Sequence, residues 1–105
     1  MKVEVSDQVL AFCRTLAPEP RRLLRDGLRR LEREEGDVQP LEGALMGFYR
    51  LRLGRYRVVF HYVQARGRRV LRCEYAGERS IIYQMFSQLA RQVKPEEMRD
   101  APTKD

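Results

Sequence analysis

The sequence predicts a single α+β domain in which two N-terminal helices pack on an antiparallel β-meander of three to four strands, with a short C-terminal helix. Three observations predict this fold class. The chain has 105 residues, a length that suits one hydrophobic core. Apolar residues recur at helical spacing up to about residue 35 and alternate with polar residues from residue 48. A second helical pattern then follows Gly77.

A short strand and a first helix are predicted at the N-terminus. Val3 and Val5 alternate with charged residues, which is typical of a strand. Ser6 or Asp7 is expected to cap a helix that runs to about Leu16. The apolar face of this helix consists of Val9, Phe12, Cys13 and Leu16.

A second helix is predicted up to about Glu35. Pro20 suits its first turn, because proline lacks an N–H group that this turn would leave unpaired. Its apolar stripe consists of Leu24, Leu28 and Leu31. Gly36 and Asp37 are expected to end the helix, and residues 38–47 to form a loop.

Three strands are predicted at residues 48–53, 56–63 and 68–76. Gly54-Arg55 suits a two-residue hairpin turn, and residues 64–67 are expected to form a second loop. The residues expected to face the core are Leu51, Leu53, Tyr56, Val58, Phe60, Tyr62, Leu71, Cys73 and Tyr75. The residues expected to face outward are Phe48, Arg50, Arg52, Arg57, Val59, His61, Val70, Arg72 and Glu74.

The first hairpin turn sets Arg52 directly opposite Arg57, which is locally destabilising unless an anion binds there. The second loop sets Arg57 opposite Glu74, so Glu74 is expected to be a charge partner of Arg57 inside a basic centre. Phe48 is expected opposite His61 on the same surface, where both rings could stack on a nucleobase. The basic centre consists of Arg50, Arg52, Arg57 and Arg72.

A last helix is predicted after the sheet ends at Gly77, with Ser80 as its cap. Its apolar residues are Ile81, Ile82, Met85, Phe86 and Leu89. The domain is expected to span residues 1–93, and residues 94–105, rich in Pro, Glu, Asp and Lys, are expected to form a flexible tail.

The net charge of +6 is concentrated in one segment of the chain. Residues 48–79 contain nine arginines and two glutamates, which gives this segment a net charge of +7. Of the 21 basic residues of the chain, 18 are arginine. Arginine stays charged and binds phosphate through two parallel hydrogen bonds, so a polyanion is the first expected partner. An acidic protein is the second.

Several other classes of function are not expected. The chain shows neither an apolar N-terminal leader nor a membrane-spanning run, so a cytoplasmic protein without membrane contact is predicted. Cys13 and Cys73 are expected to be two buried thiols. His61 is the only histidine, and phosphate-loop, dinucleotide-binding and serine-hydrolase motifs are absent from the sequence, so no cofactor or metal is expected.

Two runs of the sequence resemble the RelE/ParE superfamily of toxins from type II toxin–antitoxin modules. The first is Leu41-Glu42-Gly43 followed by the hairpin sequence from Phe48 to Phe60, FYRLRLGRYRVVF. The second is Gly77-Glu78-Arg79-Ser80-Ile81-Ile82-Tyr83, with an arginine four residues before a tyrosine. The resemblance covers nearly the whole predicted domain and implies a RelE/ParE-like, microbial ribonuclease-like fold. It also implies a cytoplasmic toxin that a cognate antitoxin holds inactive. The last predicted helix carries four apolar residues that are expected to form core or an antitoxin-binding surface, namely Ile82, Met85, Phe86 and Leu89.

The resemblance implies site residues position by position. Arg50 and Arg52 match two basic residues that RelE toxins carry on this strand, and Arg57 matches their phosphate-binding arginine. Arg79 and Tyr83 match the closing motif. The sequence departs from the best-known RelE pattern in two places. The RelE pattern has lysines at the positions of Arg50 and Arg52, and it has another arginine at the position of Gly77.

Within the superfamily, the leading hypothesis is ribosome-dependent endoribonuclease activity on messenger RNA. Metal-free cleavage of RNA needs a base, a cationic clamp and an acid. Arginine is a clamp but a very poor base, so the candidates for the base are His61, Glu74 and Tyr83. A ParE-like inhibitor of DNA gyrase without catalysis of its own is the first alternative. A non-toxic relative that only binds an antitoxin is the second.

Overall fold

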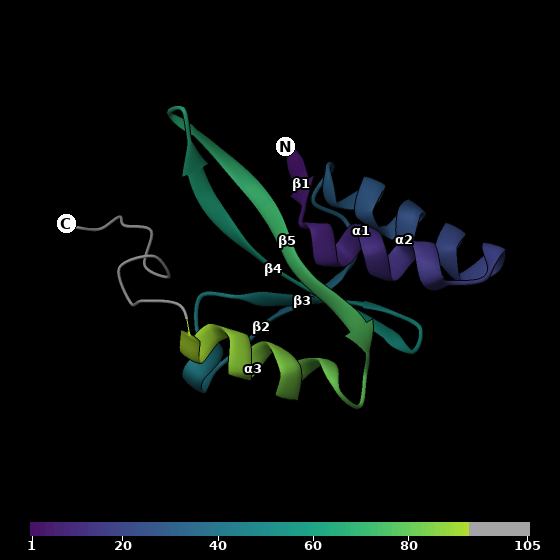
Figure 1. Ribbon diagram of the computed structural model, residues 1–105. Coiled ribbons are helices and arrows are strands. Elements are labelled where there is room, and N and C mark those ends of the chain that lie inside the picture. The colour runs from purple at the N-terminus through teal and green to yellow at the C-terminus, as the bar shows by residue number, and fades with distance from the viewer. Residues whose placement is uncertain (93–105) are drawn as a thin grey trace.

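The computed structural model describes residues 1–92, which form one five-stranded sheet with helices on both faces (Figure 1). In chain order the elements are β1 (Val3–Val5), α1 (Asp7–Thr15), α2 (Pro18–Leu31), β2 (Asp37–Pro40), the 3₁₀ helix η1 (Gly43–Leu45), β3 (Tyr49–Leu53), β4 (Tyr56–Ala65), β5 (Arg68–Glu78) and α3 (Ile82–Gln92). The strand order is β1-β5-β4-β3-β2. The predicted α+β class is confirmed, although the sheet is mixed because β1 runs parallel to β5. The tail predicted at residues 94–105 lies outside the described residues.

The main core lies between the sheet and the helices α1 and α2. It is built by the alternating apolar residues of the strands and by the helical stripe that includes Leu24 and Leu31. Its buried members are Val9, Leu24, Leu31, Leu51, Leu53, Tyr56, Val58, Phe60, Leu71, Cys73 and Ala76. The core residues predicted on β3 and β4 all belong to it, with Tyr62 packed at its margin.

Both helix ends near this core have a clear local cause. Ser6 caps α1 as predicted, because its Oγ accepts a hydrogen bond from the Val9 N–H at 3.2 Å. Helix α2 ends at Leu31, earlier than the predicted Glu35. Glu34 there takes a positive φ of 58°, and the Glu35 N–H donates to the Arg30 carbonyl at 3.0 Å. This Schellman arrangement closes the helix without a glycine.

The predicted loop at residues 38–47 is wrong at its beginning, because Asp37–Pro40 forms the edge strand β2. Every residue of β2 is exposed, so the strand has no apolar face and gives no alternation signal. It is held by antiparallel pairing with β3, in which Asp37 lies opposite Arg52 and Gln39 opposite Arg50.

The register of the first predicted hairpin is confirmed, and that of the second is wrong. On β3 and β4, Arg52 lies opposite Arg57 as predicted. Between β4 and β5 the chain turns at Arg66 and Gly67, which both take positive φ, instead of over residues 64–67. This tighter turn shifts the pairing by two residues.

A β-bulge adds one more residue to the shift between β4 and β5. Phe60 pairs with Cys73 and Val59 pairs with Tyr75, so Glu74 is the extra residue of β5. Arg57 consequently lies opposite Gly77, not opposite Glu74. The bulge also reverses the direction of Tyr75, which was predicted to share the core face of Leu71 and Cys73.

A second core lies on the other face of the sheet, beneath α3 (Figure 1). Its buried members are Leu45, Phe48, Val59, Tyr75, Ile82, Phe86 and Ala90. Phe48 and Val59 were predicted to face outward, and they do lie on that face, but α3 buries them. Val70, also predicted outward, is buried as well. The face opposite α1 and α2 is therefore only partly open.

Neither cysteine forms a disulfide. Cys73 is fully buried, and this burial raises the pKa of its thiol to about 12, whereas Cys13 is half-buried. Within residues 1–92 no helix is long and apolar enough to cross a membrane.

Candidate functional site

The structure gathers the residues that the toxin resemblance implies beside α3, on the face opposite α1 and α2. Arg50 and Arg52 extend from β3, Arg57 from β4, Arg79 follows β5, and Tyr83 lies in the first turn of α3. We call these five residues the arginine face. Arg52 and Arg57 are cross-strand neighbours, and Arg50, Arg79 and Tyr83 lie close enough to Arg57 to alter its pKa. Apolar residues alternate with other residues along β3 and β4, and their burial in the main core turns Arg50, Arg52 and Arg57 toward the opposite face of the sheet.

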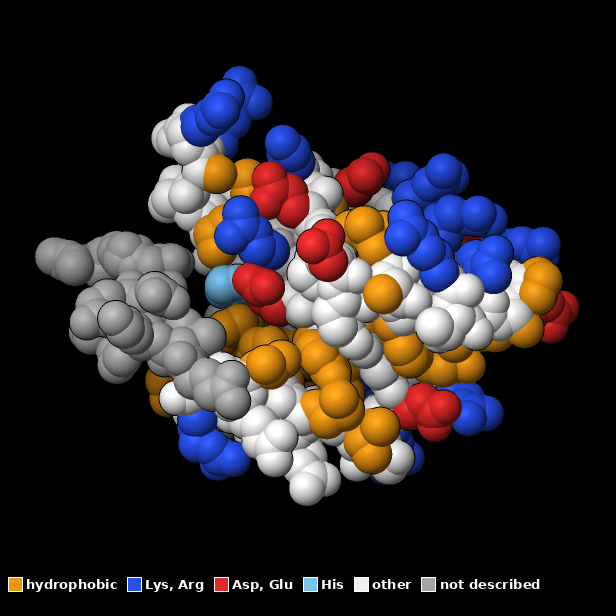
Figure 2. Space-filling model, viewed as in Figure 1, with side chains coloured by type: hydrophobic (Ala, Val, Ile, Leu, Met, Phe, Trp, Pro, Cys, Tyr) orange, Lys and Arg blue, Asp and Glu red, His pale blue; other side chains and the backbone are white. Residues whose placement is uncertain are grey.

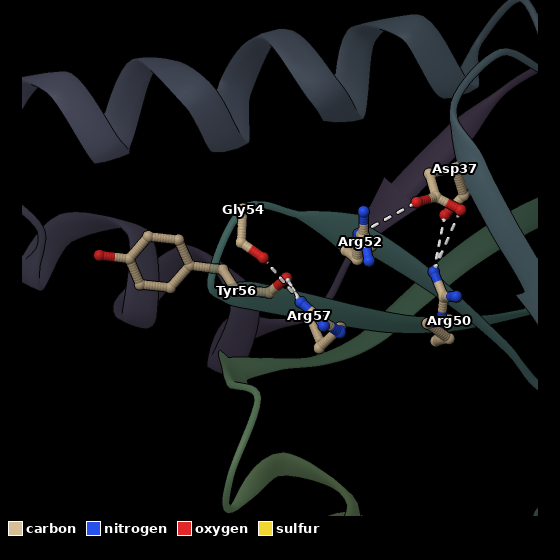
Figure 3. Close-up of polar contacts among 6 residues, drawn as sticks. All are labelled: Asp37, Arg50, Arg52, Gly54, Tyr56 and Arg57. Atoms are coloured by element: carbon tan, nitrogen blue, oxygen red, sulfur yellow. Dashed lines mark hydrogen bonds and ion pairs between the residues drawn. The ribbon is translucent and has the colours of Figure 1, made fainter.

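Arg57 is the centre of the arginine face and the one buried charged residue among those that the structure describes, with 7% of its surface exposed. Its Nη1 donates to the carbonyls of Gly54 and Tyr56, both at 2.9 Å (Figure 3). Burial lowers the pKa of Arg57, and the neighbouring arginines lower it further while Tyr83 raises it. Within residues 1–92, its Nε and Nη2 make no hydrogen bond. The guanidinium is thus fixed in place with donors left for an anion.

Asp37 of β2 contacts two members of the arginine face and was not predicted as a site residue. Its Oδ2 lies 3.1 Å from Arg52 Nε, and its Oδ1 lies 3.4 Å from Arg50 Nη1 (Figure 3). The Asp37 carbonyl also accepts from Arg50 Nη1 at 3.1 Å. The expected repulsion between Arg52 and Arg57 is therefore partly offset within the chain, because Arg52 binds Asp37 and Arg57 donates to backbone carbonyls, but Arg52 still lowers the pKa of Arg57. This contact could not be predicted, because the exposed strand β2 has no alternation of apolar and polar residues.

The predicted partner of Glu74 and the predicted role of Phe48 are both wrong. The Glu74 carboxylate binds His61 Nε2 at 2.7 Å, and it lies away from Arg57 because of the shifted register. Phe48 stacks on the His61 ring with the centroids 4.5 Å apart, as its predicted position opposite His61 implies. However, Phe48 is buried against Phe86 of α3, so its ring is not available to a nucleobase.

The His61–Glu74 pair is separated from the arginine face by the second core. Arg57 and His61 lie on the same strand and the same face, four residues apart, which is about 13 Å of strand. Val59 lies midway between them and is fully buried under α3 with its cross-strand partner Tyr75. The structure therefore does not bring His61 and Glu74 to the arginines that would bind the phosphate.

Arg72, predicted as part of the basic centre, lies opposite His61 and near the β1 edge of the sheet. Its Nε and Nη2 both donate to Glu4 Oε1, at 3.2 Å and 2.9 Å. Arg72 therefore belongs to the His61 region and not to the arginine face. Within residues 1–92 there is no cluster of His, Cys, Asp and Glu that could hold a metal ion.

Replacing Arg72 with alanine is expected to raise the pKa of Glu4. The hydrogen bond from Arg72 is the main cause that lowers this pKa, and the charges of Arg72 and Lys2 add to it. A lowered carboxyl pKa means that the pair stabilises the fold above the ordinary pKa and loses this effect as the pH falls through the folded-state pKa. NMR titration of the Glu4 carboxyl carbon measures the shift. Lys2→Ala is the control and should move the midpoint less; an unchanged midpoint in Arg72→Ala would contradict the contact.

The apolar residues of the last helix divide into two groups. Ile82 and Phe86 belong to the second core, while Met85 and Leu89 are exposed together with Ile81. Figure 2 shows hydrophobic side chains gathered over α3, whereas lysine and arginine side chains gather over α1 and α2. The prediction that this set forms core or a partner surface therefore stays open for Met85 and Leu89.

Comparisons with known proteins place this fold among toxins. No protein-family model and no curated protein sequence matches the chain. Among solved structures, a YoeB/ParE toxin from Agrobacterium tumefaciens matches with a TM-score of 0.60 and 17% identity, over 74% of this chain and 98% of the other. The RelBE2 toxin–antitoxin complex from Mycobacterium tuberculosis matches with a TM-score of 0.55 and 18% identity, over 74% of this chain and 96% of the other.

A third structure carries the assignment to a family. The archaeal RelE–RelB complex from Pyrococcus horikoshii OT3 matches with a TM-score of 0.57 and 30% identity, over 75% of this chain and 94% of the other. The match therefore spans nearly the whole of that relative, at an identity that goes beyond a shared fold. The chain belongs to the RelE/ParE superfamily of toxins from toxin–antitoxin systems.

Proposed function

We propose that this protein is a ribosome-dependent endoribonuclease that cleaves messenger RNA and is held inactive by a cognate antitoxin. The observation that carries the proposal is the buried Arg57, whose Nη1 is fixed by two backbone carbonyls while Arg50, Arg52 and Arg79 lie close enough to lower its pKa. A fixed guanidinium fork suits the pentacoordinate phosphorus of RNA cleavage, because donors that are already oriented need no reorganisation as negative charge develops.

In this proposal the arginine face binds the phosphodiester on either side of the cleaved bond. Arg57 binds the reacting phosphate, since it is the most buried of the four arginines and its electrostatic effect is least screened by water. Arg52, the cross-strand neighbour of Arg57, binds the same phosphate, and Arg50 and Arg79 bind the flanking phosphates. Tyr83, half-buried at the start of α3, orients the substrate or stacks on a base. In this proposal the ribosome supplies the message.

An antitoxin partner is proposed from the relatives and from the surface of the chain. Two of the matching structures are complexes, RelE–RelB and RelBE2. The net charge of +6 favours an acidic partner, and the exposed apolar residues of α3 offer contact area for it.

Cleavage assays on programmed ribosomes test the proposed activity. Purified protein is expected to cut a defined message within the codon in the ribosomal A site, as measured by primer extension, and to leave the free message intact. A gyrase supercoiling assay is run in parallel. Inhibition of supercoiling without any RNA product would contradict the proposal and identify a ParE-like inhibitor. Absence of both effects would identify a relative that only binds its antitoxin.

A further inference from the structure

We infer that Asp37 is the general base that removes the proton from the attacking 2′-hydroxyl. This inference rests on the proposed endoribonuclease function. The reaction needs a proton acceptor beside the reacting phosphate, and the arginines have no acceptor to offer. The three lysines of the chain lie outside the segment from Asp37 to Tyr83 that builds the arginine face.

Of the three acceptors suggested by the sequence, Tyr83 lies on the arginine face, where it is assigned the role of orienting the substrate, whereas His61 and Glu74 are poorly placed. His61 and Glu74 bind each other at 2.7 Å and are separated from Arg57 by the buried Val59. Glu78 lies near the Gly54 turn and pairs with Arg55 at 3.1 Å. Within residues 1–92, Asp37 is the one carboxylate that contacts Arg50, Arg52 or Arg57.

The position of Asp37 suits proton transfer. Its two carboxylate oxygens lie 3.1 Å from Arg52 Nε and 3.4 Å from Arg50 Nη1, and 49% of its side chain is exposed. In the proposed complex, the reacting phosphate bound between Arg57 and its cross-strand neighbour Arg52 lies next to the carboxylate that contacts Arg52. The 2′-oxygen is on the carbon next to the one that carries the phosphate, so a carboxylate beside that phosphate can approach the 2′-oxygen to the ~3 Å that proton transfer requires. The antiparallel pairing of β2 with β3 holds Asp37 opposite Arg52.

The proposed reaction is a transesterification. The 2′-hydroxyl proton goes to an Asp37 oxygen as the bond between the 2′-oxygen and phosphorus forms. The bond between phosphorus and the 5′-oxygen breaks, and the leaving oxygen takes a proton from a water molecule. The products are a 2′,3′-cyclic phosphate and a 5′-hydroxyl, and Asp37 returns its proton to solvent.

A role as counter-ion alone makes a different prediction for the same residue. As a counter-ion, Asp37 competes with the phosphate for Arg50 and Arg52, so its removal strengthens binding and does not slow the chemistry. As a base, its removal also releases the arginines, but cleavage of the bound message becomes slow. Binding and single-turnover rate measured on one variant therefore separate the two roles.

The experiment compares wild-type protein with Asp37→Asn on programmed ribosomes, with Glu78→Gln as the matched control. Asp37→Asn is expected to lower the single-turnover rate by about 10²–10⁴-fold, while ribosome affinity stays equal or increases. Asp37→Glu should recover part of the rate, and Glu78→Gln should stay within about threefold of the wild type because an exposed surface pair is worth little.

Two outcomes would overturn the inference. An Asp37→Asn rate within threefold of the wild type would leave the nuclease function standing and reject Asp37 as the base. Absence of cleavage by the wild type would reject the nuclease function as well. Asp37→Ala, which keeps the backbone pairing of the exposed strand β2, provides a second variant if Asp37→Asn does not fold.

Discussion

Replacing Arg57 with alanine is expected to lower the rate of message cleavage on programmed ribosomes by about 10²–10³-fold, the usual cost of losing one oriented donor to a developing charge. Arg57 is buried, and two carbonyls fix its Nη1, so no neighbouring side chain can take over its position. The change should appear mainly in the single-turnover rate, with a smaller loss of ribosome affinity, because the other arginines still bind the reacting and flanking phosphates.

Two variants act as controls for this result. Arg68→Ala removes the same charge from an exposed position at the far end of the β4–β5 hairpin and is expected to change the rate by less than about threefold, since exposed charges there are screened. Arg57→Lys keeps the charge but loses the planar fork, so it should recover little activity. A lysine variant as fast as the wild type would show that charge alone is required. Circular dichroism should confirm that each variant is folded.

The site could be predicted where local rules fix the geometry. The hairpin that places Arg52 opposite Arg57 follows from the turn at Gly54, whose φ is +63°, and from strict alternation on both strands. The cap at Ser6 is also local, since one side-chain oxygen meets an N–H three residues later.

The register of β4 and β5 could not be predicted, because it depends on a turn and a bulge that leave almost no sequence signal. Arg66 takes a positive φ without being a glycine, and Glu74 is an ordinary strand residue. One signal was present: Val70 and Leu71 are adjacent apolar residues, which a strand with one buried face does not need. Both are buried in the structure.

The second core beneath α3 divides the basic surface into two parts. Phe48 and Val59 are apolar residues among outward arginines, which indicates a second core on that face. Once α3 covers this core, His61 and the arginine face lie on opposite sides of it. The contact of Asp37 with the arginines required β2, and an exposed edge strand lacks the hydrophobic pattern from which strands are predicted. The arginines on β3 and β4 were thus predictable from a single hairpin. The position of Asp37 beside them was not, because it depends on the pairing of β2 with β3.

Replacing Phe60 with alanine is expected to lower the free energy of unfolding by about 3–5 kcal/mol, the usual cost of removing a buried phenylalanine ring. Phe60 is 1% exposed, and the centroid of its ring lies 5.5 Å from that of the Tyr49 ring and 6.0 Å from that of the Tyr62 ring. Small domains are stabilised by only about 5–15 kcal/mol in total, so the variant should be close to unfolding at 37 °C.

Urea denaturation followed by circular dichroism measures this loss, and Met46→Ala is the control. Met46 is 74% exposed, so its truncation should change the free energy of unfolding by less than about 0.5 kcal/mol. A loss below about 1 kcal/mol for Phe60→Ala would contradict the close packing of the main core. In a closely packed core, the cavity left by the phenylalanine ring lowers the free energy of unfolding by more than this. Phe60 points toward α1 and α2, away from Arg57, so the folded fraction of the variant should keep its activity. Stability and chemistry are thus assigned to opposite faces of β4, and the two substitutions at positions 57 and 60 test that assignment from both sides.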